Sequence, residues 1–135
     1  MVSDQSEEVM ILVTKTRNQE YAVRIYEQVQ KVKDSDNAQA FGRYAHKLPI
    51  MISTEGLVNA VSFIREKKLD DGLLLEDIRQ LIGKEFGADS VEAFLKVIRE
   101  ADIETYVLLT QKIQGALVWY KRYSKTILNV EGEEE

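Results

Sequence analysis

The chain has 135 residues, 44% of them hydrophobic, and its 18 Lys and Arg against 23 Asp and Glu give a net charge of −5. This length suits one domain with a core of its own. The absence of cysteine excludes disulfides, thiol catalysis and cysteine zinc sites, and one Pro with seven Gly leaves few turns for a many-stranded sheet. No stretch resembles a signal peptide or reaches the length of a transmembrane helix, so we expect a cytoplasmic protein without membrane contact.

The net charge hides an uneven distribution along the chain. Residues 1–8 hold three acids and residues 131–135 hold four, which leaves 16 acids and 18 bases between them. Residues 9–68 carry a charge of +4, residues 69–100 a charge of −4, and residues 101–130 a charge of +2. Two basic segments therefore bracket an acidic one. This pattern fits ordinary solvated faces, and it also fits a face that binds a polyanion.

Apolar residues recur at every third or fourth position through most of the chain, which predicts an all-α fold, a compact bundle of about five or six helices. The first helix begins at about Glu7 or Thr16 and ends near Val32. The second is expected over about residues 37–47. We divide the chain into an N-terminal extension that continues into the first helix, a single helical domain, and an acidic disordered tail. Their bounds are residues 1–15, 16–128 and 129–135.

The only proline, Pro49, stands within apolar helical sequence. A proline pushes the preceding residue out of helical geometry, which predicts a break at Leu48-Pro49 with Pro49 in the first turn of the next helix. A kinked continuous helix is the alternative. Gly56 marks a second interruption, before a helix over Leu57–Lys67. Most of the apolar residues around the proline are expected in the core: Leu48, Ile50, Met51 and Ile52.

Three more helices are expected in the second half of the chain. The first covers residues 73–84, and the second has Asp89 as its N-cap with Glu92 at the reciprocal position. The second is expected to bury Phe94, Leu95 and Ile98. The last covers residues 103–128 after the N-cap Asp102. Its inward face is predicted from spacings of three and four: Ile103, Tyr106, Val107, Thr110, Ile113, Leu117, Tyr120, Ser124 and Ile127.

Few residues could carry catalysis. One histidine without cysteine excludes ordinary zinc sites, and the cofactor motifs GxxxxGK[ST], GxGxxG and GxSxG are absent, so we expect no metal and no cofactor. A ribonuclease could use His46 with Tyr44 or Lys47, but acid–base catalysis needs two positioned groups, which sequence adjacency does not provide. We therefore expect a capping or surface role for His46 and no enzymatic activity. The adjacent acids at 70–71 and 76–77 do not face each other on a helix, and we interpret them as turn and cap residues.

The stretch WYKRYSK, residues 119–125, combines bases with aromatic rings. Lys121 and Lys125 are four residues apart and share a helix face, with Arg122 beside them. Such bases would neutralise phosphates, and the rings could stack on nucleotide bases. Alternatively Trp119 and one tyrosine belong to the core while the bases extend along the surface. Smaller groups of bases occur elsewhere: Lys15 with Arg17, Arg43 with Lys47, and Arg65 with Lys67 and Lys68.

Two segments carry a family resemblance: YAHKLPIMISTEGLVNAVSFIREK, residues 44–67, and IETYVLLTQKIQGALVWYKRYSKTIL, residues 103–128. Together they resemble the small subunit of type III-B CRISPR effector complexes, the fifth protein of the Cmr complex. The resemblance runs from about Arg17 to Leu128. The matching positions are Tyr44, Lys47, Leu48, Pro49, Gly56, Leu57, Ala60, Phe63, Trp119, Tyr120, Lys121, Arg122 and Tyr123.

The resemblance implies a compact helical subunit without catalytic activity. Such subunits stack with copies of themselves along a filament, beside the backbone subunits that hold the CRISPR RNA, and contact the large subunit. They line the channel for the target RNA, and they would contact the duplex of CRISPR RNA and target RNA through its phosphates, independently of sequence and sensitively to salt. A freestanding helical nucleic-acid-binding module and a purely structural protein adaptor are the alternatives. The expected RNA contacts are Lys15, Arg17, Arg43, Lys47, Lys121, Arg122 and Lys125, of which only Lys47, Lys121 and Arg122 fall on positions of the family pattern.

Overall fold

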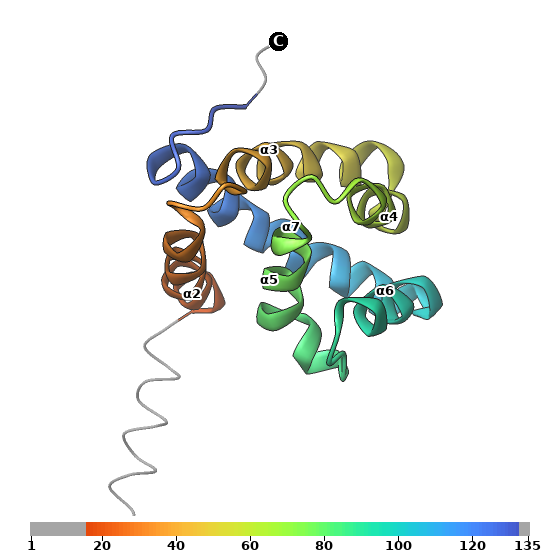
Figure 1. The fold of residues 1–135 in the computed structure, drawn as a ribbon. Coiled ribbons are helices and arrows are strands. Elements are labelled where there is room, and N and C mark those ends of the chain that lie inside the picture. The colour runs from red at the N-terminus through yellow and green to blue at the C-terminus, as the bar shows by residue number, and fades with distance from the viewer. Residues whose placement is uncertain (1–15, 133–135) are drawn as a thin grey trace, which may run out of the picture.

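The computed structural model describes residues 16–132, and the regular secondary structure in this part of the chain is all helical. Its six α-helices and one short 3-10 helix confirm the predicted all-α bundle (Figure 1). The predicted extension over residues 1–15 lies outside the described part. The elements are α2 (Arg17–Val32), α3 (Ala38–Glu55), α4 (Leu57–Lys67), α5 (Leu73–Leu81), η1 (Gly83–Phe86), α6 (Val91–Glu100) and α7 (Ile103–Thr126).

A reciprocal cap defines the start of α2. The Thr16 hydroxyl accepts from the Gln19 backbone N–H at 3.0 Å, and the Gln19 side-chain oxygen accepts from the Thr16 N–H at 2.9 Å. This arrangement satisfies two backbone donors that a helix start otherwise leaves unpaired. Of the two starts that the sequence allowed, the described structure therefore has the one at Thr16.

Helix α3 continues through Pro49, so the structure has the continuous helix rather than the break. Proline lacks the N–H that would donate to the Ala45 carbonyl one turn earlier. The Pro49 carbonyl accepts a hydrogen bond from the Gln114 side chain of α7 at 3.1 Å, which ties the two helices together here. The interruption comes instead at Gly56, where φ is +93°, a value that L side chains rarely adopt. The chain turns there into α4, whose bounds are those predicted.

Several element ends differ from the prediction. Ser90 rather than Asp89 caps α6, since its hydroxyl accepts from the Ala93 N–H at 3.0 Å. Glu92 does not complete a capping box but pairs with Arg65 of α4. Asp102 caps α7 as predicted, accepting from the Thr105 N–H at 2.8 Å. Helix α5 ends at Leu81, and the 3-10 helix η1 begins two residues later. Helix α7 ends at Thr126.

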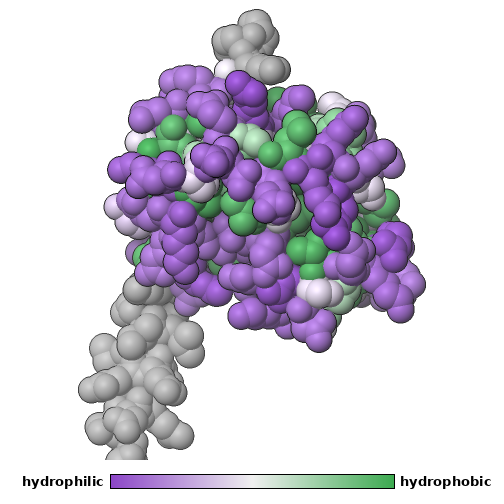
Figure 2. Space-filling view, in the orientation of Figure 1, coloured by the Kyte–Doolittle hydropathy of each residue, from purple (hydrophilic) through white to green (hydrophobic). Residues whose placement is uncertain are grey.

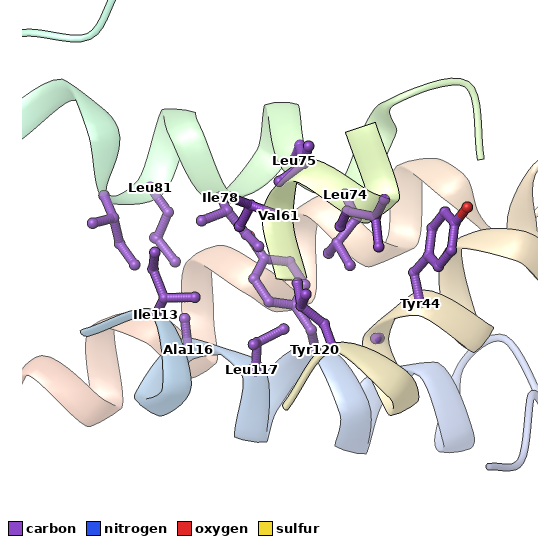
Figure 3. Packing of buried hydrophobic residues seen from close by; sticks show 14 of the residues in the cluster. Tyr44, Val61, Leu74, Leu75, Ile78, Leu81, Ile113, Ala116, Leu117 and Tyr120 are labelled. Atoms are coloured by element: carbon purple, nitrogen blue, oxygen red, sulfur yellow. The ribbon is translucent and has the colours of Figure 1, made fainter. Parts of the chain in front are cut away.

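Helix α7 is the central element of the core. It packs most extensively against α2 and α3, and it crosses the molecule diagonally so that its last turns lie next to the start of α3 (Figure 1). Side chains from α5 point toward α7, with Tyr120 between them (Figure 3). Tyr120 is fully buried and donates its hydroxyl to the side-chain oxygen of Gln28 on α2 at 2.5 Å. Leu48, Ile52, Phe94, Leu95 and Ile98 are buried as predicted.

Some predicted core residues lie at the surface. Ile103 is 74% exposed and Val107 is 46% exposed, so the first turns of α7 do not have the inward face that the spacing predicted. Ile50 is 64% exposed, while Met51 is partly buried. In the orientation of Figure 1, the surface is mostly hydrophilic with small separate apolar patches (Figure 2).

The chain after α7 also differs from the prediction. A disordered tail is expected over residues 129–135, but Val130 is only 3% exposed, because it packs on Gly42 of α3. Its backbone N–H donates to the Ser124 carbonyl at 3.0 Å. We refer to residues 128–132 as the C-terminal strap. Residues 133–135 lie outside the described part.

Candidate nucleic-acid interface

Five of the seven predicted RNA-contacting residues line one surface groove between the first half of α3 and the second half of α7. The two helices run in opposite directions (Figure 1), and the groove between them has a volume of about 1130 Å³. Arg43 and Lys47 come from α3, and Lys121, Arg122 and Lys125 come from α7. The structure thus brings together two basic segments that are more than 70 residues apart in the chain.

Helical periodicity explains why these side chains face the groove. Arg43 and Lys47 are four residues apart, as are Lys121 and Lys125, so each pair lies on one helix face. The opposite faces are anchored in the core by buried side chains, Ala45 and Leu48 on α3 and Leu117, Tyr120 and Ser124 on α7. The cations are therefore held on rigid elements and exposed to solvent.

The groove carries a strongly positive charge. Its five cations face a single carboxylate, that of Glu131 in the C-terminal strap, whose oxygen lies 4.0 Å from Lys125 Nζ. Both partners of this pair are exposed, so water and salt screen it. Within residues 16–132, Arg43, Lys47 and Lys121 form no ion pair. A groove with excess positive charge attracts polyanions and focuses their approach.

Apolar side chains form another part of the groove. Ile50 of α3, Val118 of α7 and Leu69 of the α4–α5 turn line it, and each is largely exposed. Sequence reasoning missed this apolar part. Val118 could have been assigned to the groove, because it lies three residues before Lys121 on the same helix face. Leu69 could not, since a turn residue has no helical register.

The C-terminal strap closes one side of the groove. His46 of α3 donates its Nε2–H to the Val130 carbonyl at 2.9 Å, since a carbonyl can only accept. Glu131 and Gly132 then line the groove beside Lys125. In the described part of the chain, this is the hydrogen bond that His46 makes, and it gives the histidine a structural role close to the expected one.

Tyr44, one of the two groups that could assist His46, also has a structural contact. Its hydroxyl accepts from the Leu69 backbone N–H at 3.3 Å. Burial raises the pKa of Tyr44, which keeps the phenol protonated. Neither contact arranges the two groups as an acid–base pair. Within residues 16–132, no three acidic or histidine side chains are grouped so that they could hold a metal ion.

Besides lining the groove, Arg122 contacts the ring of Trp119. The guanidinium carbon lies over the indole, 4.9 Å from the ring centroid. The indole N–H donates to the side-chain oxygen of Asn18 on α2 at 2.8 Å. Trp119 is partly buried, so this one residue both packs on α2, as a core aromatic would, and supports a cation of the groove.

The remaining predicted contacts lie apart from the groove. Arg17 lines a smaller hollow of about 330 Å³ between the start of α2 and the middle of α7, where Lys112 pairs with Glu85 at 3.1 Å. Lys15 lies outside the described residues. The bases at the end of α4 are also separate, because Arg65 pairs with Glu92 and Lys67 lies over the Phe63 ring.

The fold and the groove together define a small all-helical protein with a cationic face built by two antiparallel helices. Residues 17–127 match the family model described as CRISPR-associated protein (Cas_Cmr5), and the chain belongs to this family. This confirms the resemblance seen in the sequence. No helix in the described part combines the length and apolar character needed to cross a membrane.

A curated relative and a solved structure agree with this assignment. The chain is 28% identical over 115 residues to the CRISPR system Cmr subunit Cmr5 of Thermus thermophilus, covering 84% of this chain and 97% of the relative. A crystal structure of a CRISPR-associated Cmr5 family protein, also from Thermus thermophilus, superposes with a TM-score of 0.76 at 26% identity. The superposition covers 84% of this chain and 99% of that one.

Proposed function

We propose that this chain is a non-catalytic small subunit of a type III-B CRISPR (Cmr) effector complex and lines the path of the CRISPR RNA and its target RNA. Family membership supports the place in a Cmr complex. The observation that carries the RNA contact is the groove, in which five cations from two helices face one carboxylate. The partners would be the backbone and large subunits and further copies of this chain, in the cytoplasm.

The groove suits contact with RNA phosphates. Lys and Arg neutralise phosphates and release counterions, so binding of this kind falls steeply with salt and does not depend on sequence. Base pairing between guide and target then supplies the specificity, as in other RNA-guided systems. The exposed Ile50, Leu69 and Val118 at the same groove would contact a neighbouring protein subunit, since apolar residues bordering polar ones are typical of interfaces.

The test is reconstitution with a guide-loaded backbone subunit. One variant changes Lys47, Lys121 and Lys125 to glutamine. A control variant makes the same three charge changes outside the groove, at Lys33, Lys84 and Lys96, which are all exposed. We expect both variants to enter the complex. The groove variant should bind target RNA at least about tenfold more weakly, with a salt dependence reduced by two to three phosphate contacts, roughly one per lysine.

Other results would assign other functions. If the groove variant enters the complex and binds RNA as the control does, the groove is a protein adaptor surface. If the unaltered protein does not enter the complex but binds RNA tightly alone, it is a freestanding nucleic-acid-binding module. Equal losses in both variants would show a general charge effect rather than a defined RNA path.

A further inference from the structure

We propose that Arg122 and Trp119 form a stacking platform for an unpaired RNA base at the edge of the groove. This inference rests on the proposed function, because it requires RNA in the groove. It goes further in naming the form of RNA that the site takes. A strand held by phosphates alone can be single or paired, whereas a stacking platform requires an unpaired base with a free face.

Side chains and backbone groups of α2 and α7 fix the position of this platform. Trp119 is held by its hydrogen bond to Asn18, and its ring centroid lies 5.6 Å from that of Tyr123. Tyr123 donates its hydroxyl to the Ala22 carbonyl of α2 at 3.0 Å, and its ring packs edge-on against Tyr26 at 5.5 Å. Hydrogen bonds and ring contacts thus fix the position of the indole before any ligand binds, which reduces the entropy lost on binding.

The indole in turn positions Arg122. The guanidinium lies over one face of the Trp119 ring, and a cation at this distance is attracted by the negative face of the ring. Arg122 is exposed and forms no ion pair within residues 16–132. A guanidinium is planar, and because Arg122 is exposed, the side of the group that points away from the indole is open to a further flat group. Nucleotide bases stack on guanidinium planes as well as on aromatic rings.

The charge of the surroundings favours RNA over a protein partner as the occupant. Arg122 lines the same groove as Arg43, Lys47, Lys121 and Lys125, so a strand whose phosphates follow these cations passes the platform. Trp, Tyr and Arg are also common in protein interfaces, and an acidic peptide is the competing occupant. Four further cations beside the platform match the regular charge of a phosphate backbone more closely than that of an ordinary protein surface.

The test uses the full chain, in which Trp119 is the only tryptophan, so its fluorescence reports on the platform directly. The ligands are a short oligoadenylate, an abasic ribose-phosphate chain of the same length, and an RNA duplex, all at low salt. Stacking contributes about 1–3 kcal/mol per base, so we expect the oligoadenylate to bind roughly tenfold more tightly than the abasic chain. Only the oligoadenylate should change the Trp119 emission strongly.

Arg122→Lys is the matched variant, because it keeps the positive charge and removes the planar group. It should lose the preference for the oligoadenylate over the abasic chain and keep its affinity for the abasic chain. Arg43→Lys makes the same change in the same groove, at a residue that no ring underlies among the described contacts, and should keep the preference. A duplex that binds as tightly as the oligoadenylate would contradict the inference.

The outcomes separate this inference from the proposed function. If the lysine-to-glutamine groove variant loses RNA affinity while Arg122→Lys keeps the base preference, or if no base preference exists, the groove binds RNA and the platform is refuted. If no RNA changes the Trp119 emission and the groove variant binds RNA as its control does, both are refuted. An acidic peptide that alone changes the emission, in a manner sensitive to Arg122→Lys, would assign the platform to a protein partner instead.

Discussion

Val130 of the C-terminal strap packs directly on Gly42 of α3: a Cβ atom added to Gly42 would lie 2.6 Å from the Val130 Cβ. Real Cβ atoms essentially never approach so closely, so the strap occupies the space that a side chain would fill. The His46 hydrogen bond to the Val130 carbonyl lies one helical turn further along α3. The absence of a side chain at one position thus allows the strap to form one side of the groove.

Gly42→Ala should therefore destabilise the protein, although alanine is the better helix former. The helical preference contributes about 1 kcal/mol in favour of alanine. Displacing Val130 loses about 2 kcal/mol of apolar burial and about 1 kcal/mol for the His46 hydrogen bond. The net loss is about 2 kcal/mol, measured as the free energy of unfolding in urea.

Gly115→Ala in α7 is the matched control for this prediction. The nearest atom to an added Cβ there is Tyr21 Cε2 at 3.9 Å, an ordinary contact. The same substitution should be neutral or stabilise by up to about 1 kcal/mol. Equal stability of the two variants would mean that the docking of Val130 contributes nothing. A Gly42→Ala, Val130→Gly double variant should recover part of the loss, since glycine at 130 removes the Cβ that lies 2.6 Å from the added methyl group and lets the strap return to His46.

Of the two adjacent acids in the turn before α5, Asp70 is predicted to contribute more to the free energy of unfolding. It is 2% exposed, and its two carboxylate oxygens accept from the Gly72 N–H at 2.9 Å and from the Leu74 N–H at 2.8 Å. Both donors lie at the start of α5, where no intrahelical acceptor is available. Asp70→Ala leaves them unpaired and should lower the free energy of unfolding by about 2 kcal/mol, measured by urea unfolding.

The neighbouring Asp71 provides the control. It is exposed and has φ of +61°, a conformation that Asn tolerates well. Asp71→Asn should change the free energy of unfolding by less than about 0.5 kcal/mol. A similar loss for Asp71→Asn and Asp70→Ala would show that the charge of the turn, rather than the two hydrogen bonds, stabilises the start of α5.

The helices were predictable because each has a local signal, and the errors occurred where position depends on another part of the chain. Spacing shows which residues of α7 share a face, but not which of two adjoining faces the neighbouring helices cover. In the first turns of α7 they cover Tyr106 and Leu109. Ile103 and Val107 therefore lie exposed although their spacing continues that of Ile113 and Leu117. Pro49 was misleading for a similar reason, since the residues on either side of it, Leu48 and Ile52, are buried against other helices, which the local sequence does not show.

The cations of the groove could be predicted from the sequence, but their arrangement in one groove could not. Each pair of cations is visible in the sequence as bases four residues apart, but only tertiary structure shows that α3 and α7 are adjacent and that Arg17 lies elsewhere. The contact of His46 with Val130 joins residues 84 positions apart and has no local signal. The acidic tail composition even pointed away from it, because a single valine among glutamates gives no periodicity.

Asp77 gives the protein a predicted pH dependence of stability. Burial, together with the neighbouring Glu76 carboxylate, raises the pKa of Asp77 to about 7, and Lys31 only partly opposes these effects. In the unfolded chain this carboxyl has its ordinary pKa near 3.8. Between these values the folded state binds more protons than the unfolded state, so stability falls as the pH rises from about 4 to about 7.

Glu76 acts in a different range and does not obscure this effect. The Arg79 side chain, which hydrogen-bonds to Glu76 at 2.6 Å, lowers the pKa of that carboxyl below its ordinary 4.5. Its contribution to stability is complete above that value and is lost only as the pH falls through the lowered pKa. A stability profile measured from about pH 5 to about pH 8 therefore lies above the range in which Glu76 loses its contribution.

Asp77→Asn should remove the decline, because the amide keeps the shape of the carboxyl and cannot ionise. At about pH 8 the variant should be more stable than the unaltered protein by on the order of 2 kcal/mol, and the difference should shrink steadily as the pH falls through about 5 toward about 4. Urea unfolding at several pH values across this range measures the difference. Asp34→Asn, at an exposed acid in the turn between α2 and α3, makes the same change in net charge and should leave the decline in place. An Asp77→Asn profile parallel to that of the unaltered protein would show that the Asp77 carboxylate is accommodated in the folded state without loss of stability.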